Sequence, residues 1–160
     1  MVRLEPVAAD APRARALLTE YFAMRGEAFP AGQAYTPVFP APPVFDPPAG
    51  VLLVVVDDEG TEPADVGCGG IRRIDDSPAG IRYEVKHLYL QPRARGRGWG
   101  RLLLSELEAR ARAWDAAELV LDTHHTLDAA GALYARSGFV PVARYNDNPN
   151  ATVWLRKALG

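Results

Sequence analysis

The stretch that most constrains the fold is Leu88–Leu104, LYLQPRARGRGWGRLLL, in which an apolar run, a turn-like segment and an amphipathic run follow one another. The middle segment interleaves arginines with glycines: Arg93, Arg95, Gly96, Arg97, Gly98, Gly100 and Arg101. Glycine accepts positive φ without steric cost, so several backbone N–H groups can point into one concavity. A helix that begins there adds unpaired N–H groups and its positive dipole end. The pattern predicts a strand, a turn and a helix that bind phosphate or pyrophosphate.

The spacing of the glycines excludes two common nucleotide-binding motifs. No Lys follows the glycines, as a P-loop requires, and Arg101 stands where a dinucleotide-binding fingerprint has its last glycine. The segment Arg95-x-x-Gly98-x-Gly100 instead resembles the pyrophosphate loop of the GNAT family of acyl-CoA-dependent N-acyltransferases. Considered alone, the segment has an alternative interpretation as a turn with solvated arginines.

Two further segments resemble the same family, in the right order and spacing. Glu84–Leu90 is similar to the strand on the acceptor side, and Ala130–Phe139 is similar to the segment A-x-x-LY-x-x-x-GF. The resemblance covers roughly residues 50–159 well. It implies the GNAT acyl-CoA N-acyltransferase fold, a mixed and mostly antiparallel α/β sheet. A central parallel pair is splayed at a β-bulge, and helices flank the sheet.

The hydrophobic pattern agrees with this fold. Hairpin signals predict an antiparallel meander of strands over 51–56, 65–73 and 81–91. A helix separates strand 81–91 from a strand over 118–123, so these two can lie parallel. Apolar alternation breaks within 81–91, as a β-bulge would cause.

Turn and capping signals predict the remaining elements. The chain is expected to form one domain over 1–160, in which the proline-rich segment 27–49 is an ordered lid whose aromatic side chains pack down, with a disordered loop as the alternative. The other expected elements are a strand over 2–6, a helix capped by Asp10 and ended by Gly26, a helix from Gly98 onward, a helix over 128–136 ended by Gly138, and a final hairpin of strands over 139–145 and 151–159.

Composition narrows the class of protein. With 48% hydrophobic and 24% charged residues, the chain resembles an ordinary globular domain. A net charge of −2 argues against nucleic-acid binding. The single Cys68 cannot form an intrachain disulfide and is expected to be a buried filler in a reducing compartment. Because no signal-peptide pattern is visible and the longest apolar run, Val51–Val56, is too short to span a membrane, we expect a cytoplasmic protein.

Formation of an amide from a thioester needs a base for the amine, donors for the oxyanion and a proton for the leaving thiolate. Glu84 is the predicted general base, directly or through a water, with a surface carboxylate paired with Lys86 or Arg82 as the alternative. His87 is the second candidate base, and a histidine packed under the sheet is its alternative. Tyr134, which matches the tyrosine of the family's segment, is the predicted general acid, with an amphipathic core tyrosine as the alternative.

The resemblance implies acetyl-CoA as co-substrate and no metal. The residues expected to bind it are Leu88, Tyr89, Leu90, Arg95, Gly96, Arg97, Gly98, Trp99, Gly100, Arg101 and Tyr134. A backbone N–H at Leu90 or its neighbours is the expected oxyanion donor. Leu127 departs from the family, since many members carry an Asn there. Adjacent His124 and His125 would point to opposite faces of a strand, and no cluster supplies further metal ligands.

These observations predict an N-acetyltransferase that moves the acetyl group of acetyl-CoA to a primary amine by direct attack in a ternary complex. The expected acceptor is a small molecule such as an amino acid or polyamine, because an aromatic lid and the hairpin segment Tyr145–Pro149 would enclose it. We expect a monomer or homodimer without nucleic-acid or membrane partners. The alternatives are a protein N-terminus or lysine as acceptor, and a non-catalytic acyl-CoA sensor, which would need neither Glu84 nor Tyr134.

Overall fold

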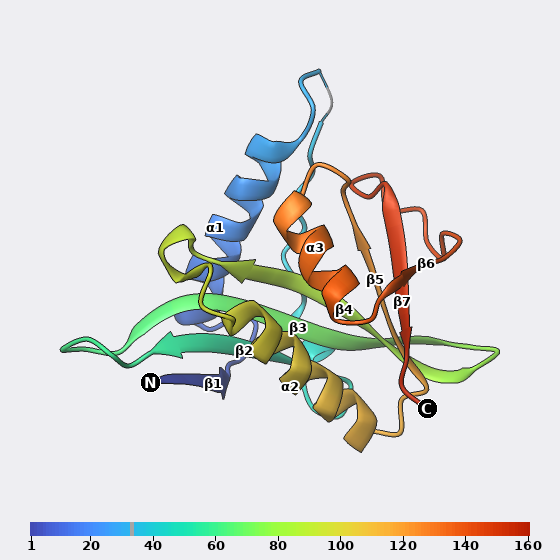
Figure 1. The fold of residues 1–160 in the computed structure, drawn as a ribbon, viewed down its shortest axis with the longest axis horizontal. Helices are drawn as coiled ribbons and strands as arrows, with labels where there is room; N and C mark the ends of the chain where they lie inside the picture. Colours follow the sequence, from blue (N-terminus) through green and yellow to red (C-terminus); the bar gives the residue numbers. More distant parts are fainter. Residues whose placement is uncertain (33) are drawn as a thin grey trace.

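A seven-stranded sheet with helices on both faces forms the framework of the computed structural model, which describes residues 1–32 and 34–160 (Figure 1). The strand order is β1-β2-β3-β4-β5-β7-β6, and only the β4–β5 pair is parallel. The strands are β1 (Val2–Pro6), β2 (Gly50–Asp57), β3 (Ala64–Ser77), β4 (Gly80–Leu90), β5 (Glu118–Thr123), β6 (Val140–Pro141) and β7 (Val153–Ala158). The predicted mixed, mostly antiparallel sheet is confirmed.

The helices divide between the two faces of the sheet. They are α1 (Pro12–Ala28), α2 (Trp99–Ala113) and α3 (Asp128–Arg136), with short 3₁₀ turns at Pro42–Phe45 and Pro92–Ala94. Alternate side chains of the apolar strand β2 pack into two separate clusters, one with α1 and the other with α2 and α3. In Figure 1, α2 and α3 lie on the near side of the sheet. No helix of the described residues is long and apolar enough to cross a membrane.

Strand β4 carries the irregularity that the sequence predicts. Cys68 pairs with Tyr89 and Gly70 pairs with Lys86, so two residues of β4 lie opposite one residue of β3. His87, at this bulge, has a φ of 58°. Strand β5 pairs with β4 only over Arg82–Glu84 and then separates from it. The predicted bulge and splayed parallel pair are therefore confirmed.

Two predicted boundaries of α1 are wrong. Ala11, not Asp10, is the N-cap, and it makes no side-chain cap hydrogen bond. Pro12 at the first helical position has a preset φ and no N–H to satisfy, so a side-chain cap is dispensable. The helix also continues past Gly26 to Ala28, because the Gly26 backbone stays helical rather than turning to positive φ.

The predicted strand over 139–145 is also wrong, since β6 covers only Val140–Pro141. One more backbone hydrogen bond follows, from Val142 to Trp154, and the chain then leaves β7. Side chains further along hold it elsewhere: Tyr145 donates a hydrogen bond to Glu84 at 2.6 Å. Long-range hydrogen bonds to β4 and β5 thus replace the regular hairpin.

Within segment 27–49, of which Gln33 lies outside the described residues, the aromatic side chains of Tyr35, Phe39 and Phe45 pack on α1 and on the bulge of β4. Phe45 is only 4% exposed. The Phe39 ring lies 4.9 Å from that of Phe22, and the Tyr35 ring lies 6.4 Å from it. The described part of this lid thus forms an aromatic wall beside β4.

Candidate active site

The glycine-rich loop joins β4 to α2 and leaves its concave face open. Gly96 and Gly98 have φ values of 78° and 80°, which explains why both positions are glycine. A Cβ atom added at either would meet no other atom within 4 Å, so the space it would enter is vacant of protein. Gly98 is the N-cap of α2, whose first-turn N–H groups have no helical partner. This geometry fits a pyrophosphate.

The arginines of the loop do not all serve one site. Arg95 lines the main cavity, and its Nε donates to the Leu90 carbonyl at 3.0 Å. The Arg97 guanidinium stacks 4.9 Å above the Trp99 ring. Arg101, in the first turn of α2, instead lines a smaller pocket between α2 and β7.

Gly100 has a packing role. A Cβ atom there would approach a methyl carbon of Leu133 to 3.3 Å and one of Leu90 to 3.5 Å. Glycine therefore lets the start of α2 lie close to both α3 and β4. This contact brings the loop next to the end of β4 where the sheet opens.

Beyond the bulge, β4 exposes one side of its backbone. The Gln91 N–H donates to Val66 on β3 at 2.8 Å. Because successive N–H groups of a strand point to opposite sides, the Leu90 N–H points to the side from which β5 has separated. Leu88 lines the cavity, whereas the Tyr89 hydroxyl donates to Glu20 at 3.1 Å, on the α1 face. Of Tyr89, only the backbone is placed to contact a ligand in the splay.

A cavity of about 810 Å³ continues from the splay toward the lid. One part of its wall consists of β4 and α3 residues, including Leu88 and Tyr134. The other part consists of α1, the lid and the polar segment between β6 and β7, including Arg25 and Asn146. Because Arg95 of the loop and Leu88 of β4 both line this cavity, it extends from the loop past the splay toward the lid.

Tyr134 is held by α3 at the cavity wall and is 6% exposed. Burial raises the pKa of its hydroxyl above the ordinary value, so the phenol stays protonated at neutral pH. No described residue forms a hydrogen bond with this hydroxyl, which leaves it able to donate to a ligand. Leu127, the departure from the family pattern, immediately precedes α3 and also lines the cavity.

Glu84 lies behind the cavity wall and is 1% exposed. Its Oε1 accepts a hydrogen bond from Arg72 Nε at 2.9 Å and lies 2.8 Å from Arg72 Nη2 in an ion pair, and its Oε2 accepts from the Tyr145 hydroxyl at 2.6 Å. Lys86 Nζ lies 3.8 Å away. The carboxylate is therefore buried and fully engaged, unlike the surface group considered as the alternative.

Asp122 is a site residue that the sequence analysis missed. It lines the cavity from β5, and its Oδ2 accepts from Asn146 at 2.7 Å, while its Oδ1 accepts from Asn148 at 3.1 Å. Lys86 Nζ lies 3.5 Å from Oδ1. A carboxylate near the end of an otherwise apolar strand, ELVLDT, was the available signal.

His87 faces the lid, with the rings of Tyr21, Phe22 and Phe45 between 5.5 and 6.0 Å away. Burial, helped by the nearby Lys86 charge, lowers the pKa of the imidazole to about 3. Its buried Nδ1 has no hydrogen-bond partner among the described residues. A neutral imidazole with so low a pKa is a weak base, so His87 is less suited to proton transfer than its ordinary pKa suggests.

The lowered pKa of His87 predicts a pH-dependent stability. Below pH 6.5, the ordinary pKa of histidine, His87 binds a proton in the unfolded chain. In the folded chain the imidazole stays neutral until about pH 3. His87 therefore lowers the free energy of unfolding by about 1.4 kcal/mol per pH unit on acidification across this window. His87→Asn, which tolerates positive φ, should remove this component in urea unfolding measured at several pH values. Equal slopes for both proteins would contradict the buried placement.

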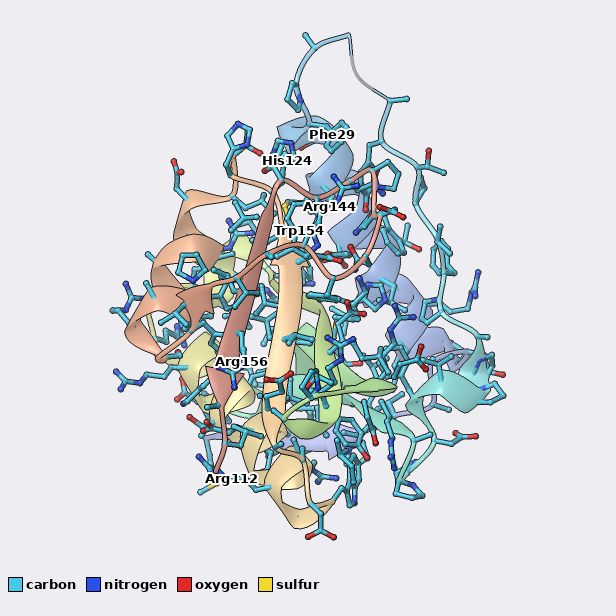
Figure 2. All side chains as sticks on the ribbon, turned by 90° about the vertical axis from the view of Figure 1, so that its right-hand side faces the viewer. Phe29, Arg112, His124, Arg144, Trp154 and Arg156 are labelled. Carbon is cyan, nitrogen blue, oxygen red and sulfur yellow. The ribbon has the colours of Figure 1, made fainter. Side chains whose placement is uncertain are left out.

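The two adjacent histidines do not point to opposite faces, and that prediction is wrong. Their rings stack at 4.5 Å with an interplanar angle of 25°. They follow the end of β5, so strand alternation does not apply to them. Figure 2 shows His124 beside Phe29, whose ring lies 5.0 Å away. Within residues 1–32 and 34–160, no group of three or more His, Cys, Asp or Glu side chains is positioned to hold a metal.

Comparison with known proteins agrees with this geometry. A model of the acetyltransferase (GNAT) family matches residues 14–139. An uncharacterized N-acetyltransferase of Schizosaccharomyces pombe is 33% identical over 66% of this chain, and the match covers 61% of that protein's length.

Solved structures share the whole fold. A proposed acyl-CoA N-acyltransferase of Klebsiella pneumoniae has a TM-score of 0.74 and 28% identity, covering 100% of this chain and 99% of that one. A GNAT acetyltransferase of Elizabethkingia anophelis, solved with acetyl-CoA bound, has a TM-score of 0.63 at 15% identity, over 99% of this chain and 98% of that one. With a family match that spans most of its length, an open glycine loop and a splayed β4–β5 pair, the chain belongs to the GNAT family of acetyltransferases.

Proposed function

We propose that this protein transfers the acetyl group of acetyl-CoA to the primary amine of a small molecule. The observation that carries the proposal is that the open glycine loop and the splay beside Leu90 lie next to one cavity, whose wall includes Arg95 of the loop and Leu88 of β4. The first part suits a pyrophosphate, the second an extended thiol arm, and the third a small acceptor. An aromatic wall that closes over the cavity favours a compact acceptor over a long peptide.

The residues present fit acetyl-CoA. Gly96 and Gly98 with the first turn of α2 would hold its pyrophosphate, and Arg95 and Arg97 would add charge-assisted donors. The Leu88–Leu90 backbone would pair with its pantetheine arm in the splay. When bound, this co-substrate supplies an activated acetyl thioester. This geometry does not favour a contact of the co-substrate with Arg101, which lines the other pocket.

Three groups of the chain would perform the proton transfers and stabilise charge. The Leu90 N–H would donate to the carbonyl oxygen as negative charge develops on it. The Tyr134 hydroxyl would donate its proton as the C–S bond breaks, which yields the free thiol. A carboxylate would take the proton that the amine releases as the C–N bond forms.

Two carboxylates are candidates for this base: Glu84, which the sequence predicts, and Asp122. We favour Asp122 because it lies on the cavity wall and its oxygens retain capacity for a water or an ammonium group. Glu84 would then act as a positioning residue that fixes Arg72, Lys86 and Tyr145.

The isosteric variants Asp122→Asn and Glu84→Gln separate these roles. We expect Asp122→Asn to lower kcat by about 100-fold while the KM for acetyl-CoA stays near the wild-type value. Glu84→Gln should lower the melting temperature, because the Arg72 charge loses its partner. It should lower kcat less than Asp122→Asn does. The reverse pattern, with the larger kcat loss in Glu84→Gln, would restore Glu84 as the base.

Thiol release from acetyl-CoA, followed across a panel of small amines, amino acids, polyamines and lysine-containing peptides, tests the proposed function. Release with one class of small amine is the expected result. Release only with peptides would overturn the small-molecule acceptor. Binding of acetyl-CoA without release for any amine would favour a non-catalytic acyl-CoA sensor.

A further inference from the structure

Arg25 is a buried cation on the acceptor side of the cavity. It lies in the last turn of α1, lines the cavity and is 8% exposed. Its Nη1 donates to the Tyr21 hydroxyl at 3.0 Å and its Nη2 donates to the Asn150 carbonyl at 2.9 Å. Both acceptors are neutral. A guanidinium has five N–H groups, so these contacts leave donors uncommitted.

The other charged groups around Arg25 are either paired or exposed to solvent. Glu84 pairs with Arg72, and Asp122 pairs with Lys86, which also lies near Glu84. Arg95 and Asp128 also line the cavity, but both are exposed. No acidic side chain of the described residues lies within 4.0 Å of the Arg25 guanidinium. A buried charge normally has a counterion, because burial without one is costly. Arg25 is therefore a buried positive charge that no described acidic side chain neutralises.

Aromatic rings line one side of Arg25. Its guanidinium carbon lies 5.5 Å from the centre of the Tyr35 ring and 6.0 Å from that of Tyr21. Phe22 and Phe39, whose rings are 4.9 Å apart, continue this wall along α1 and the lid. A ligand that reaches Arg25 with an anionic group would thus lay an apolar body against aromatic rings.

Arg25 shares the cavity with the proposed reacting groups. Its side chain lines the same cavity as Asp122, the favoured base, and Tyr134, the proposed proton donor. One small molecule in this cavity can therefore present an amine to Asp122 and Tyr134 and an anionic group to Arg25.

From this juxtaposition we infer that the acceptor is an amino carboxylate with an apolar side chain, whose carboxylate pairs with Arg25. The inference rests on the proposed function and narrows it from small amines to amino acids. A polyamine would instead place a second positive charge beside Arg25 and would be repelled. Arg25 is accordingly a specificity-determining residue rather than a catalytic one.

The test compares matched acceptors that differ only in the carboxylate: phenylalanine against phenethylamine, and leucine against 3-methylbutylamine. The wild-type protein should show a kcat/KM about 100-fold higher for each amino acid than for its decarboxylated analogue, as expected for hydrogen bonds to a charged group. Arg25→Gln should remove this preference, leave turnover of the decarboxylated amines within about threefold and leave the Kd of acetyl-CoA unchanged.

Two further variants control for indirect effects. Arg13→Gln removes a cation from the same helix that pairs with Asp65 away from the cavity wall, and it should keep the preference. Arg25→Lys keeps the charge without the guanidinium fork and should retain part of the preference even if Arg25→Gln folds poorly. A weaker Kd for acetyl-CoA in Arg25→Gln would assign Arg25 to the co-substrate instead.

The wild-type comparison alone can overturn the inference. Equal or faster turnover of the decarboxylated amines would refute the carboxylate subsite while leaving the proposed acetyltransferase activity standing. No thiol release with any amine or amino acid would remove the proposed function and this inference with it.

Discussion

Gly98→Val is expected to weaken acetyl-CoA binding by more than about 100-fold, because the substitution acts on the pyrophosphate cradle in two ways. The added side chain enters space that no protein atom occupies and that the ligand would fill. The left-handed φ of 80° is also unfavourable for a β-branched residue, so the N-cap of α2 would shift and misdirect its N–H groups. Calorimetric titration with acetyl-CoA measures the loss directly.

The strain of positive φ needs its own control. Gly32→Val provides one, since Gly32 has a φ of 84° and open space around a Cβ, yet lies in the lid far along the chain from the glycine loop. It should lower the melting temperature to a similar extent and leave the Kd of acetyl-CoA close to that of the wild type. Wild-type affinity in Gly98→Val would mean that the loop is only a turn.

Tyr134→Phe is expected to lower kcat by about 100-fold with little change in the Kd of acetyl-CoA. The hydroxyl contributes a proton to the leaving thiolate, whereas the ring, packed 5.9 Å from Phe139, contributes the packing. No described residue is hydrogen-bonded to this hydroxyl, so removing it breaks no hydrogen bond within the described part of the protein. The melting temperature should therefore stay nearly unchanged.

A second buried tyrosine provides the matched control. The Tyr83 hydroxyl donates to the Pro48 carbonyl at 2.7 Å, outside the cavity wall. Tyr83→Phe should therefore lower stability by about 1 kcal/mol and leave kcat unchanged. Unaltered kcat in Tyr134→Phe, in the same assay, would remove Tyr134 from the mechanism.

The features that could be predicted from the sequence are those that short segments of the chain encode. The glycine loop follows from residues within Leu88–Leu104, and an irregular β4 follows from a break in alternation over eleven residues, which the family resemblance identifies as a bulge. A parallel β4–β5 pair is possible because a helix connects the two strands. The loop and the irregular strand depend on local backbone chemistry, whereas the parallel pair depends on the connection through α2, and the structure confirms all three.

The acceptor side could not be predicted in the same way, because it is assembled from segments far apart in the chain. Arg25 meets Asn150 across 125 positions, and Asp122 meets the asparagines of the β6–β7 segment. The sequence does show an arginine, Arg25, on the apolar stripe of α1 and a carboxylate, Asp122, in an apolar strand. Neither pattern indicates the distant residues with which that side chain interacts. The same long-range hydrogen bonds shorten β6, which hairpin patterns alone predict to be longer.

Calorimetric titration of the wild-type protein with acetyl-CoA tests the central claim most directly. The loop, the splay and the cavity together predict saturable binding of one acetyl-CoA per chain, competed by free CoA and lost in Gly98→Val. An absence of heat and of any thermal shift at millimolar acetyl-CoA would contradict the assignment of the cleft between β4 and β5 as an acyl-CoA site.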